Sequence, residues 1–147
     1  MRLYLDNCCF NRPFDDQTQL KIRLESEAKL YIQSKILDGK YELAWSYILD
    51  FENFQNPFEQ RKDTIENWQE RASIDITETE DIIQLAETIE NTGTKSKDAL
   101  HLACAISAKC DYFITTDIKI LNKSIESIKL IDPIGFIKAM EDDCNDD

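Results

Sequence analysis

The sequence predicts a single α/β domain with a mainly parallel β-sheet. Two observations predict this fold class: short apolar segments alternate with stretches of helical periodicity, and the 147 residues include only three glycines and three prolines. So few glycines and prolines argue against an all-β protein with many tight turns. Strands that alternate with helices are usually joined by right-handed crossovers, which make the strands parallel.

The first part of the chain is expected to contain a strand, a loop and a long helix. Apolar residues in Arg2–Leu5 predict a strand that ends at Asp6, and the proline and Asx residues of Asn11–Asp16 favour a loop. Over residues 17–37, apolar residues recur at steps of three or four, which predicts a helix that ends at Gly39. The residues expected to share one face of this helix are Leu20, Leu24, Ala28, Tyr31 and Ile32.

A second strand and two helices are expected next. Tyr41–Trp45 has the composition of a strand, and Ser46 suits the N-cap of a helix that continues to about Phe54. Asn56-Pro57 breaks this helix, because the residue before a proline avoids the helical conformation. A further helix is expected over Phe58–Arg71.

A third strand and two more helices follow. Ile74–Ile76 is short and β-branched, as a buried strand often is. Thr77–Glu80 matches a capping box, which predicts a helix up to about Glu90. Ser96 is expected to cap another helix, which ends near Lys109.

Two strands and a helix complete the predicted domain. Tyr112–Thr115 is the fourth strand and is followed by Asp117, and Ile128–Ile131 is the fifth. Pro133 begins the final helix, at a position that tolerates proline because its backbone nitrogen needs no partner there.

The charge balance is strongly acidic, with 29 acids against 17 bases and a net charge of −12. Proteins that grip nucleic acid by its phosphates usually carry a basic face, so a nucleic-acid function here requires metal ions or a local basic strip. The best candidates for such a strip are Lys119, Lys123 and Lys129. Several acids lie in residues 141–147, which predicts a solvated acidic tail after a domain of residues 1–140.

The composition also bears on the compartment. No apolar stretch approaches the ~20 residues of a membrane helix, and Asp6 interrupts the N-terminal segment before a signal peptide develops. The sequence therefore predicts a cytoplasmic protein with no membrane partner. The five cysteines form no C-x-x-C pair and His101 is the single histidine, which favours reduced thiols over a zinc site of the Cys/His type.

Four acidic residues are candidates for a shared site. In an open parallel sheet, ligands bind beyond the carboxyl ends of the strands, where the strand order reverses. Asp6 directly follows the first predicted strand, and Asp117 follows the fourth. Asp98 lies at the start of the helix before the fourth strand, and Glu52 lies on the short helix after the second.

Such acids point to metal-dependent hydrolysis. Converging carboxylates repel one another, and a divalent cation relieves the repulsion. Mg²⁺ binds oxygen ligands and keeps several waters, one of which can attack a phosphodiester, and two metal ions would stabilise both the attacking and the leaving oxygens. Position alone does not establish the site, because 29 acids are present and aspartate is also a common turn and capping residue.

A family resemblance strengthens this interpretation. Leu3–Gln17, with the sequence LYLDNCCFNRPFDDQ, resembles the first motif of a bacterial subgroup of PIN domains. Lys97–Ala103 (KDALHLA) and Tyr112–Asp117 (YFITTD) resemble the two C-terminal PIN motifs. The three segments occur in the family's order and separation, and the likeness covers nearly the whole chain.

The resemblance implies a three-layer α/β/α PIN-like fold with a five-stranded, mainly parallel sheet and an acidic pocket that holds Mg²⁺ or Mn²⁺. It implies an endoribonuclease that cleaves RNA. Many relatives are toxins that pair with an antitoxin protein, and many form homodimers.

The family's site residues are carried over position by position. Asp6, Asp98 and Asp117 match its aspartates. For the family's glutamate we choose Glu52, by residue type and by distance from Ser46, while Asp50 remains the alternative. A hydroxyl neighbours the last aspartate in many relatives, so Thr116 is expected to orient the metal's water.

Further residues have two interpretations each. Arg12 could hold a phosphate or pair with Asp15 or Asp16. His101 is expected to be a core or hydrogen-bonding residue rather than a catalytic one. Two groups are expected to pack rather than to react or to stack on bases: the cysteines Cys8 and Cys9, and the aromatic residues Trp45, Phe51 and Phe54.

Two other functions compete with a ribonuclease. A receiver-like phosphoacceptor shares the parallel sheet and an acidic Mg²⁺ pocket, but it usually has an early pair of acids, and Asp6 has no acidic neighbour in the next eight residues. A catalytically weak or inactive PIN-fold module that only binds other proteins fits the net charge of −12. Of these two alternatives, the sequence favours the interaction module.

Overall fold

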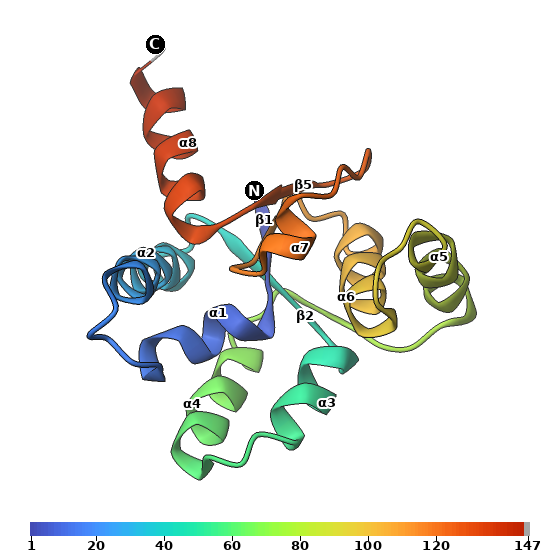
Figure 1. Ribbon diagram of the computed structural model, residues 1–147, viewed down its shortest axis with the longest axis horizontal. Helices are drawn as coiled ribbons and strands as arrows, with labels where there is room; N and C mark the ends of the chain where they lie inside the picture. The colour runs from blue at the N-terminus through green and yellow to red at the C-terminus, as the bar shows by residue number, and fades with distance from the viewer. Residues whose placement is uncertain (146–147) are drawn as a thin grey trace.

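The computed structural model describes residues 1–145, and its centre is a five-stranded parallel sheet (Figure 1). The strand order is β3-β2-β1-β4-β5, and all four neighbouring pairs are parallel. The strands are β1 (Arg2–Leu5), β2 (Glu42–Ser46), β3 (Ile74–Ile76), β4 (Tyr112–Ile114) and β5 (Lys129–Ile131). The predicted α/β class and the predicted strands are confirmed, with ends shifted by about one residue.

Helices cover both faces of this sheet. In Figure 1, α2 and α8 lie on one side of the strands, and α6 and α5 lie on the other. The short helices α3 and α4 follow β2 and lie near the end of the sheet where α1 begins. The helices are α1 (Asn7–Asn11), α2 (Leu20–Leu37), α3 (Tyr47–Phe54), α4 (Glu59–Gln69), α5 (Glu80–Glu90), α6 (Ser96–Ser107), α7 (Ile118–Leu121) and α8 (Pro133–Asn145), with a 3₁₀ turn η1 at Arg12–Phe14.

The core is centred on β1 and β4. Leu3, Tyr4 and Leu5 are completely buried, as expected for a central parallel strand with helices on both faces. The ring of Tyr4 stacks on Phe113 of β4, with ring centroids 5.2 Å apart. Burying each such side chain contributes roughly 1.5–3 kcal/mol.

The strand order sets the place of a site. From β1 the chain moves outward to β2 and β3 and then returns to the other side of β1 as β4 and β5, so the order reverses between β1 and β4. Loops leaving two such strands diverge and leave room for a ligand. Asp6 follows β1 at this point, and its backbone nitrogen donates to Ile114 of β4 at 2.9 Å.

Several element ends differ from the predictions because other side chains form the caps. The predicted loop at Asn11–Asp16 is largely helical in α1 and η1, and α1 begins where Asp6 accepts from the Asn7 nitrogen. Thr79, not Thr77, caps α5 by accepting from the Ile82 nitrogen.

Two further ends lie near the predicted site. Ser96 is the first residue of α6 rather than its cap, and its hydroxyl donates to Glu90. The short helix α7, which the sequence did not predict, is capped by Asp117.

The predicted apolar face of α2 is only partly correct. Ala28 and Ile32 are buried, but Leu20, Leu24 and Tyr31 are 59%, 44% and 50% exposed. Polar residues of α2 occupy the inner face instead. The buried polar side chains of α2 are Glu25, Ser26, Lys29 and Gln33.

At the C-terminus, α8 continues through the acidic segment as far as Asn145, and residues 146–147 of the predicted tail lie outside the described residues. The division into a domain of residues 1–140 and a tail stays a prediction. None of the described helices is long and apolar enough to cross a membrane. The cysteine side chains that the structure describes, Cys8, Cys9, Cys104 and Cys110, are free thiols.

Lys29 should make stability depend on pH. Its side chain is 4% exposed, and its amine lies 5.2 Å from the ring centroid of Phe10 and 5.9 Å from that of Trp68. Burial lowers its pKa to about 7, whereas an unfolded lysine titrates near ~10.4. Between these values the unfolded chain binds more protons, so this group makes the fold more stable as pH rises, with a slope approaching ~1.4 kcal/mol per pH unit.

We therefore expect Lys29→Met to stabilise the protein at pH 7 by roughly 1–3 kcal/mol, after allowance for the lost cation–π contacts. The difference from wild type should shrink as pH is raised to 10, because Lys29 of the unfolded wild-type chain then also begins to lose its proton. Urea unfolding of both proteins at pH 7, 8.5 and 10 measures this gap. A gap that is constant or grows with pH would show that Lys29 keeps an ordinary pKa.

Candidate active site

Asp6 lies at the centre of the candidate site. It is 8% exposed and directly follows β1. One carboxylate oxygen, Oδ1, accepts from the Asn7 nitrogen at 2.8 Å and so caps α1. The other, Oδ2, accepts from the Thr115 hydroxyl at 2.8 Å. These two contacts fix the direction of the carboxylate at the carboxyl end of the sheet.

Glu52 lies on α3, and its carboxylate is close to that of Asp6. Ser46 caps this helix by accepting from the Leu49 nitrogen at 3.3 Å, as predicted. Glu52 Oε2 accepts from the side-chain amide of Asn7 at 3.3 Å. Burial acts to raise the pKa of Glu52, but the hydrogen bond and charge of His101 outweigh it and hold that pKa below its usual value.

Asp50, the alternative to Glu52, is engaged elsewhere. Its Oδ1 accepts from the indole nitrogen of Trp45 at 2.8 Å. Of these two acids, Glu52 is the one that the structure places beside Asp6.

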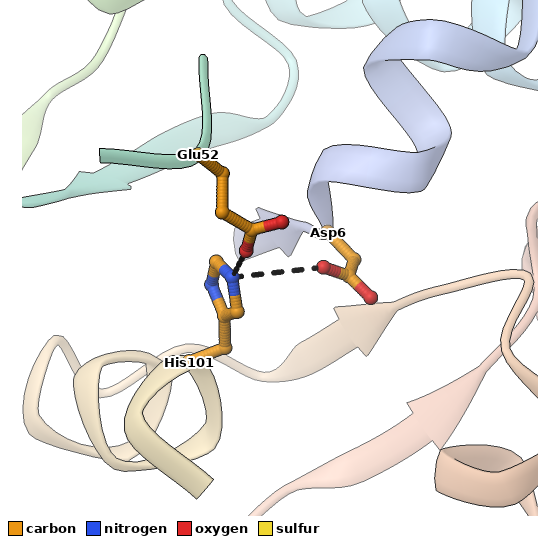
Figure 2. Close-up of side chains that lie close together, drawn as sticks. All are labelled: Asp6, Glu52 and His101. Carbon is orange, nitrogen blue, oxygen red and sulfur yellow. Dashed lines mark hydrogen bonds and ion pairs between the residues drawn. The ribbon is translucent and has the colours of Figure 1, made fainter. Parts of the chain in front are cut away.

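His101 is the third member of the cluster (Figure 2). It lies on α6, one turn after Asp98, and is 1% exposed. Its Nε2 forms a hydrogen bond with Glu52 Oε1 and lies 3.9 Å from Asp6 Oδ1. Its Nδ1 lies 2.6 Å from the Tyr4 hydroxyl. The predicted buried, hydrogen-bonded histidine is therefore present, and it lies within the acidic cluster.

Asp98 lies close enough to this cluster, and to Asp117, to interact with them electrostatically. Burial raises the pKa of Asp98, and the charges of Asp6, Asp117 and Glu52 raise it further. Asp117 Oδ1 accepts from the Lys119 nitrogen at 2.9 Å as the cap of α7. Their assignment as metal ligands stays a prediction.

Two threonines after β4 have different roles. Thr115 is fully buried, and its hydroxyl donates to Asp6 and accepts from the Asp117 nitrogen at 3.1 Å, so it bridges two predicted acids. The hydroxyl of Thr116 accepts from Arg12 at 3.0 Å. The role predicted for Thr116 in orienting a water remains untested by these contacts.

Arg12 forms ion pairs with residues from several elements beside Thr116. Its guanidinium pairs with Asp15 at 3.1 Å, which confirms one of its two predicted interpretations, and lies 3.6 Å from buried Glu25 of α2. Asp15 also accepts from Arg61 of α4 at 3.2 Å. This ion-pair cluster, Arg12, Asp15, Glu25 and Arg61, connects α2, η1 and α4 beside Thr116.

Four residues that contact the cluster were not predicted as part of it. They are Tyr4, Asn7, Cys8 and Thr115; the Cys8 thiol lies 3.6 Å from Asp6 Oδ2. The one available signal was their position next to Asp6 and Asp117 in the sequence. Among the aromatic residues, Trp45 is buried as expected, but Phe51 and Phe54 are 51% and 75% exposed and do not belong to this chain's core.

The cluster could hold a divalent cation. One ligand atom each from Asp6, Glu52 and His101 lies within 4.8 Å of the others. Burial and, after it, the charges of neighbouring carboxylates raise the pKa of Asp98, and a bound cation would offset the repulsion between these carboxylates. Carboxylate oxygens suit Mg²⁺ and Mn²⁺, so the residues fit the expected metal.

Comparisons with known proteins support the fold. The structure is similar to a chain in the crystal structure of VapBC2 from Rickettsia felis bound to a DNA fragment from their promoter, with a TM-score of 0.57 and 18% identity over 88% of this chain and 97% of that chain. It is also similar to VapBC-1 from nontypeable Haemophilus influenzae, with a TM-score of 0.52 and 19% identity over 90% and 98% of the two chains. No protein-family model and no curated protein matches the sequence. The likeness confirms the PIN-like fold.

Thr115 should stabilise the site through its hydroxyl. Thr115→Val keeps the side-chain shape but leaves Asp6 Oδ2 and the Asp117 nitrogen each without one partner. Because the hydroxyl is buried, we expect the free energy of unfolding to fall by ~1–3 kcal/mol. Urea unfolding measures the loss, and Thr115→Ser, which keeps the hydroxyl, is the matched control. Equal stability of the valine variant and wild type would contradict this role.

Proposed function

We propose that the protein is a Mg²⁺- or Mn²⁺-dependent endoribonuclease that hydrolyses RNA phosphodiester bonds. The observation that carries the proposal is the convergence of Asp6 and Glu52 with His101, within 4.8 Å, where the strand order reverses in a PIN-like fold. The sequence resemblance to PIN domains supports the same function. Position in the fold and donor chemistry therefore point to one site.

The proposed roles follow from the contacts. Asp6 and Glu52 bind the metal, and Asp98 and Asp117 complete the acidic pocket from α6 and α7. When bound, the divalent cation lowers the pKa of a water and balances negative charge on the phosphodiester. Asn7 holds Glu52 and Thr115 holds Asp6, so each carboxylate keeps one direction. Thr116, placed by Arg12, is proposed to orient the water.

A cleft beside Asp98 is proposed to hold the RNA backbone. Lys95, Lys119 and Lys123 line this cleft together with Asp98. Although the net charge of the chain is −12, these three lysines beside a proposed metal ligand form a local positive region. Such a region can neutralise the phosphates of an RNA backbone. Two of the three lysines predicted as a basic strip, Lys119 and Lys123, are among them.

We further propose that the protein acts in the cytoplasm as the toxin of a toxin–antitoxin pair and that it forms homodimers. The two similar structures, both described as VapBC, support a protein partner. Exposed apolar side chains also favour association with proteins. On α3 and just before α4 these are Phe51, Phe54 and Phe58.

A catalytically inactive interaction module is the second candidate. The same exposed phenylalanines and the net charge of −12 favour it. The two candidates differ in whether RNA is cleaved, so a cleavage assay with purified protein separates them.

Asp6→Asn should abolish RNA cleavage. Asparagine can still cap α1 but removes the negative charge that binds the cation, so we expect kcat/KM to fall at least ~100-fold. The assay follows a fluorescent oligoribonucleotide in Mn²⁺ and in Mg²⁺. Asp63→Asn, a substitution at an exposed acid of α4, is the control and should cleave as wild type does. Cleavage retained in Asp6→Asn would identify a contaminating nuclease and remove the support for this function.

Lys95→Ala/Lys119→Ala should weaken substrate binding and leave chemistry intact. Weaker binding should raise KM while kcat changes less. Because each lysine–phosphate contact releases counterions, the negative slope of log affinity against log salt concentration should become less steep by about 1.4 when two such contacts to a single strand are lost. Oligonucleotide binding and kinetics at several salt concentrations measure both effects. Lys21→Ala/Lys138→Ala, at exposed lysines away from the cleft, is the matched control. An unchanged salt slope would place the RNA elsewhere.

A further inference from the structure

The proposed metal site contains a nitrogen donor as well as carboxylates. His101 is 1% exposed, and in Figure 2 its imidazole points with Nε2 toward the carboxylates of Glu52 and Asp6. The distance from Nε2 to Asp6 Oδ1 is 3.9 Å, and Nε2 forms a hydrogen bond with Glu52 Oε1. A cation bound by both carboxylates therefore lies within reach of this nitrogen.

A buried hydrogen-bond chain holds the other side of the ring. His101 Nδ1 lies 2.6 Å from the Tyr4 hydroxyl, which lies 2.6 Å from the hydroxyl of Ser46. Ser46 is fully buried at the end of β2 and is fixed in turn as the cap of α3. Nδ1–H can donate to Tyr4, whose O–H can donate to Ser46. In this arrangement Nδ1 carries a hydrogen, and Nε2 can offer its lone pair to a cation once the cation replaces the hydrogen that Nε2 donates to Glu52.

Such an outer partner is typical of a metal-binding histidine. A ligating imidazole usually donates its second N–H to a fixed acceptor, which sets the tautomer and the ring orientation. The edge of the His101 ring meets Tyr4 at a centroid distance of 5.7 Å and an interplanar angle of 71°, which further fixes the ring. The Tyr4 and Ser46 hydroxyls thus hold Nε2 in the cluster without occupying it.

We propose that His101 is a direct ligand of the metal, and that the site is a mixed nitrogen–oxygen centre that selects a transition-metal dication such as Mn²⁺ over Mg²⁺. Mg²⁺ is bound almost entirely by oxygen, whereas imidazole favours first-row transition metals. The proposal deepens the proposed ribonuclease function, on which it rests, by assigning the class of cation that the site takes. The competing role for His101 is to hold Glu52 through a hydrogen bond without touching the metal.

The single histidine of the chain makes a direct test possible. Tag-free protein is prepared with ¹⁴N-histidine and with ¹⁵N-histidine, loaded with Mn²⁺, and examined by pulsed electron paramagnetic resonance. Direct ligation predicts a nitrogen coupling to Mn²⁺ that changes from the ¹⁴N to the ¹⁵N pattern between the two samples. Bound Mn²⁺ without this coupling would overturn the proposal, as would a wild-type protein that binds no Mn²⁺.

Variants supply an independent measurement. His101→Gln should lower Mn²⁺ affinity at least ~10-fold, measured by calorimetry, and Mg²⁺ affinity by much less, so the preference for Mn²⁺ should narrow. Tyr4→Phe removes the outer hydrogen bond and should reduce Mn²⁺ affinity while the nitrogen coupling remains. Equal losses for both cations in His101→Gln would favour the role of holding Glu52 and overturn ligation.

The test of His101 as a metal ligand and the test of RNA cleavage can give different outcomes, which separates the two proposals. RNA cleavage that depends on Asp6, with Mn²⁺ bound but no nitrogen coupling, would retain the ribonuclease and remove the mixed centre. Nitrogen coupling without RNA cleavage would retain the mixed centre and remove the ribonuclease. The spectroscopic measurement uses unmodified side chains, so its outcome does not depend on whether a buried variant folds.

Discussion

Parallel pairing of β1 between β2 and β4 is the constraint on which the rest of the structure depends. It buries Leu3–Leu5 completely and brings Asp6 to the point where the strand order reverses. The same pairing places Thr115 after β4, where its hydroxyl reaches Asp6. Glu52 and His101 then approach from the helices that flank these strands. The apolar core and the polar cluster are therefore two consequences of one strand arrangement.

The polar groups beneath the cluster illustrate how a core tolerates hydrogen-bonding side chains. Tyr4 is fully buried, and its ring packs on Phe113 while its hydroxyl meets Ser46 and His101. Because the hydroxyls of Tyr4 and Ser46 and both nitrogens of His101 each have a partner, burial of these groups costs little, and the partners fix one arrangement of side chains. Tyr4 thus packs its ring against a strand of the core and, through its hydroxyl, fixes the orientation of the His101 ring on α6.

Much of the fold could be predicted from the sequence, because strands and helices leave local patterns and strand-terminal acids mark the carboxyl edge. Asp6 and Glu52 followed from those patterns and from family resemblance. The place of His101 within the cluster did not, since it depends on how α6 packs against α3 and β1, which no local pattern encodes. The same holds for α2, where periodicity could not distinguish the face with Leu20 from the face with Lys29.

The ion-pair cluster around Arg12 has a consequence for the order of the surrounding side chains. Two guanidinium groups, Arg12 and Arg61, share the carboxylate of Asp15, and Glu25 supports Arg12 from beneath. Arg12 also donates to Thr116, so the segment after β4 is held to the same ion-pair cluster as α2 and α4. Side chains that are ordered in advance lose little conformational entropy when they form a further contact. Charged side chains from three elements thus hold one another in place, so a contact made with them would cost little additional ordering.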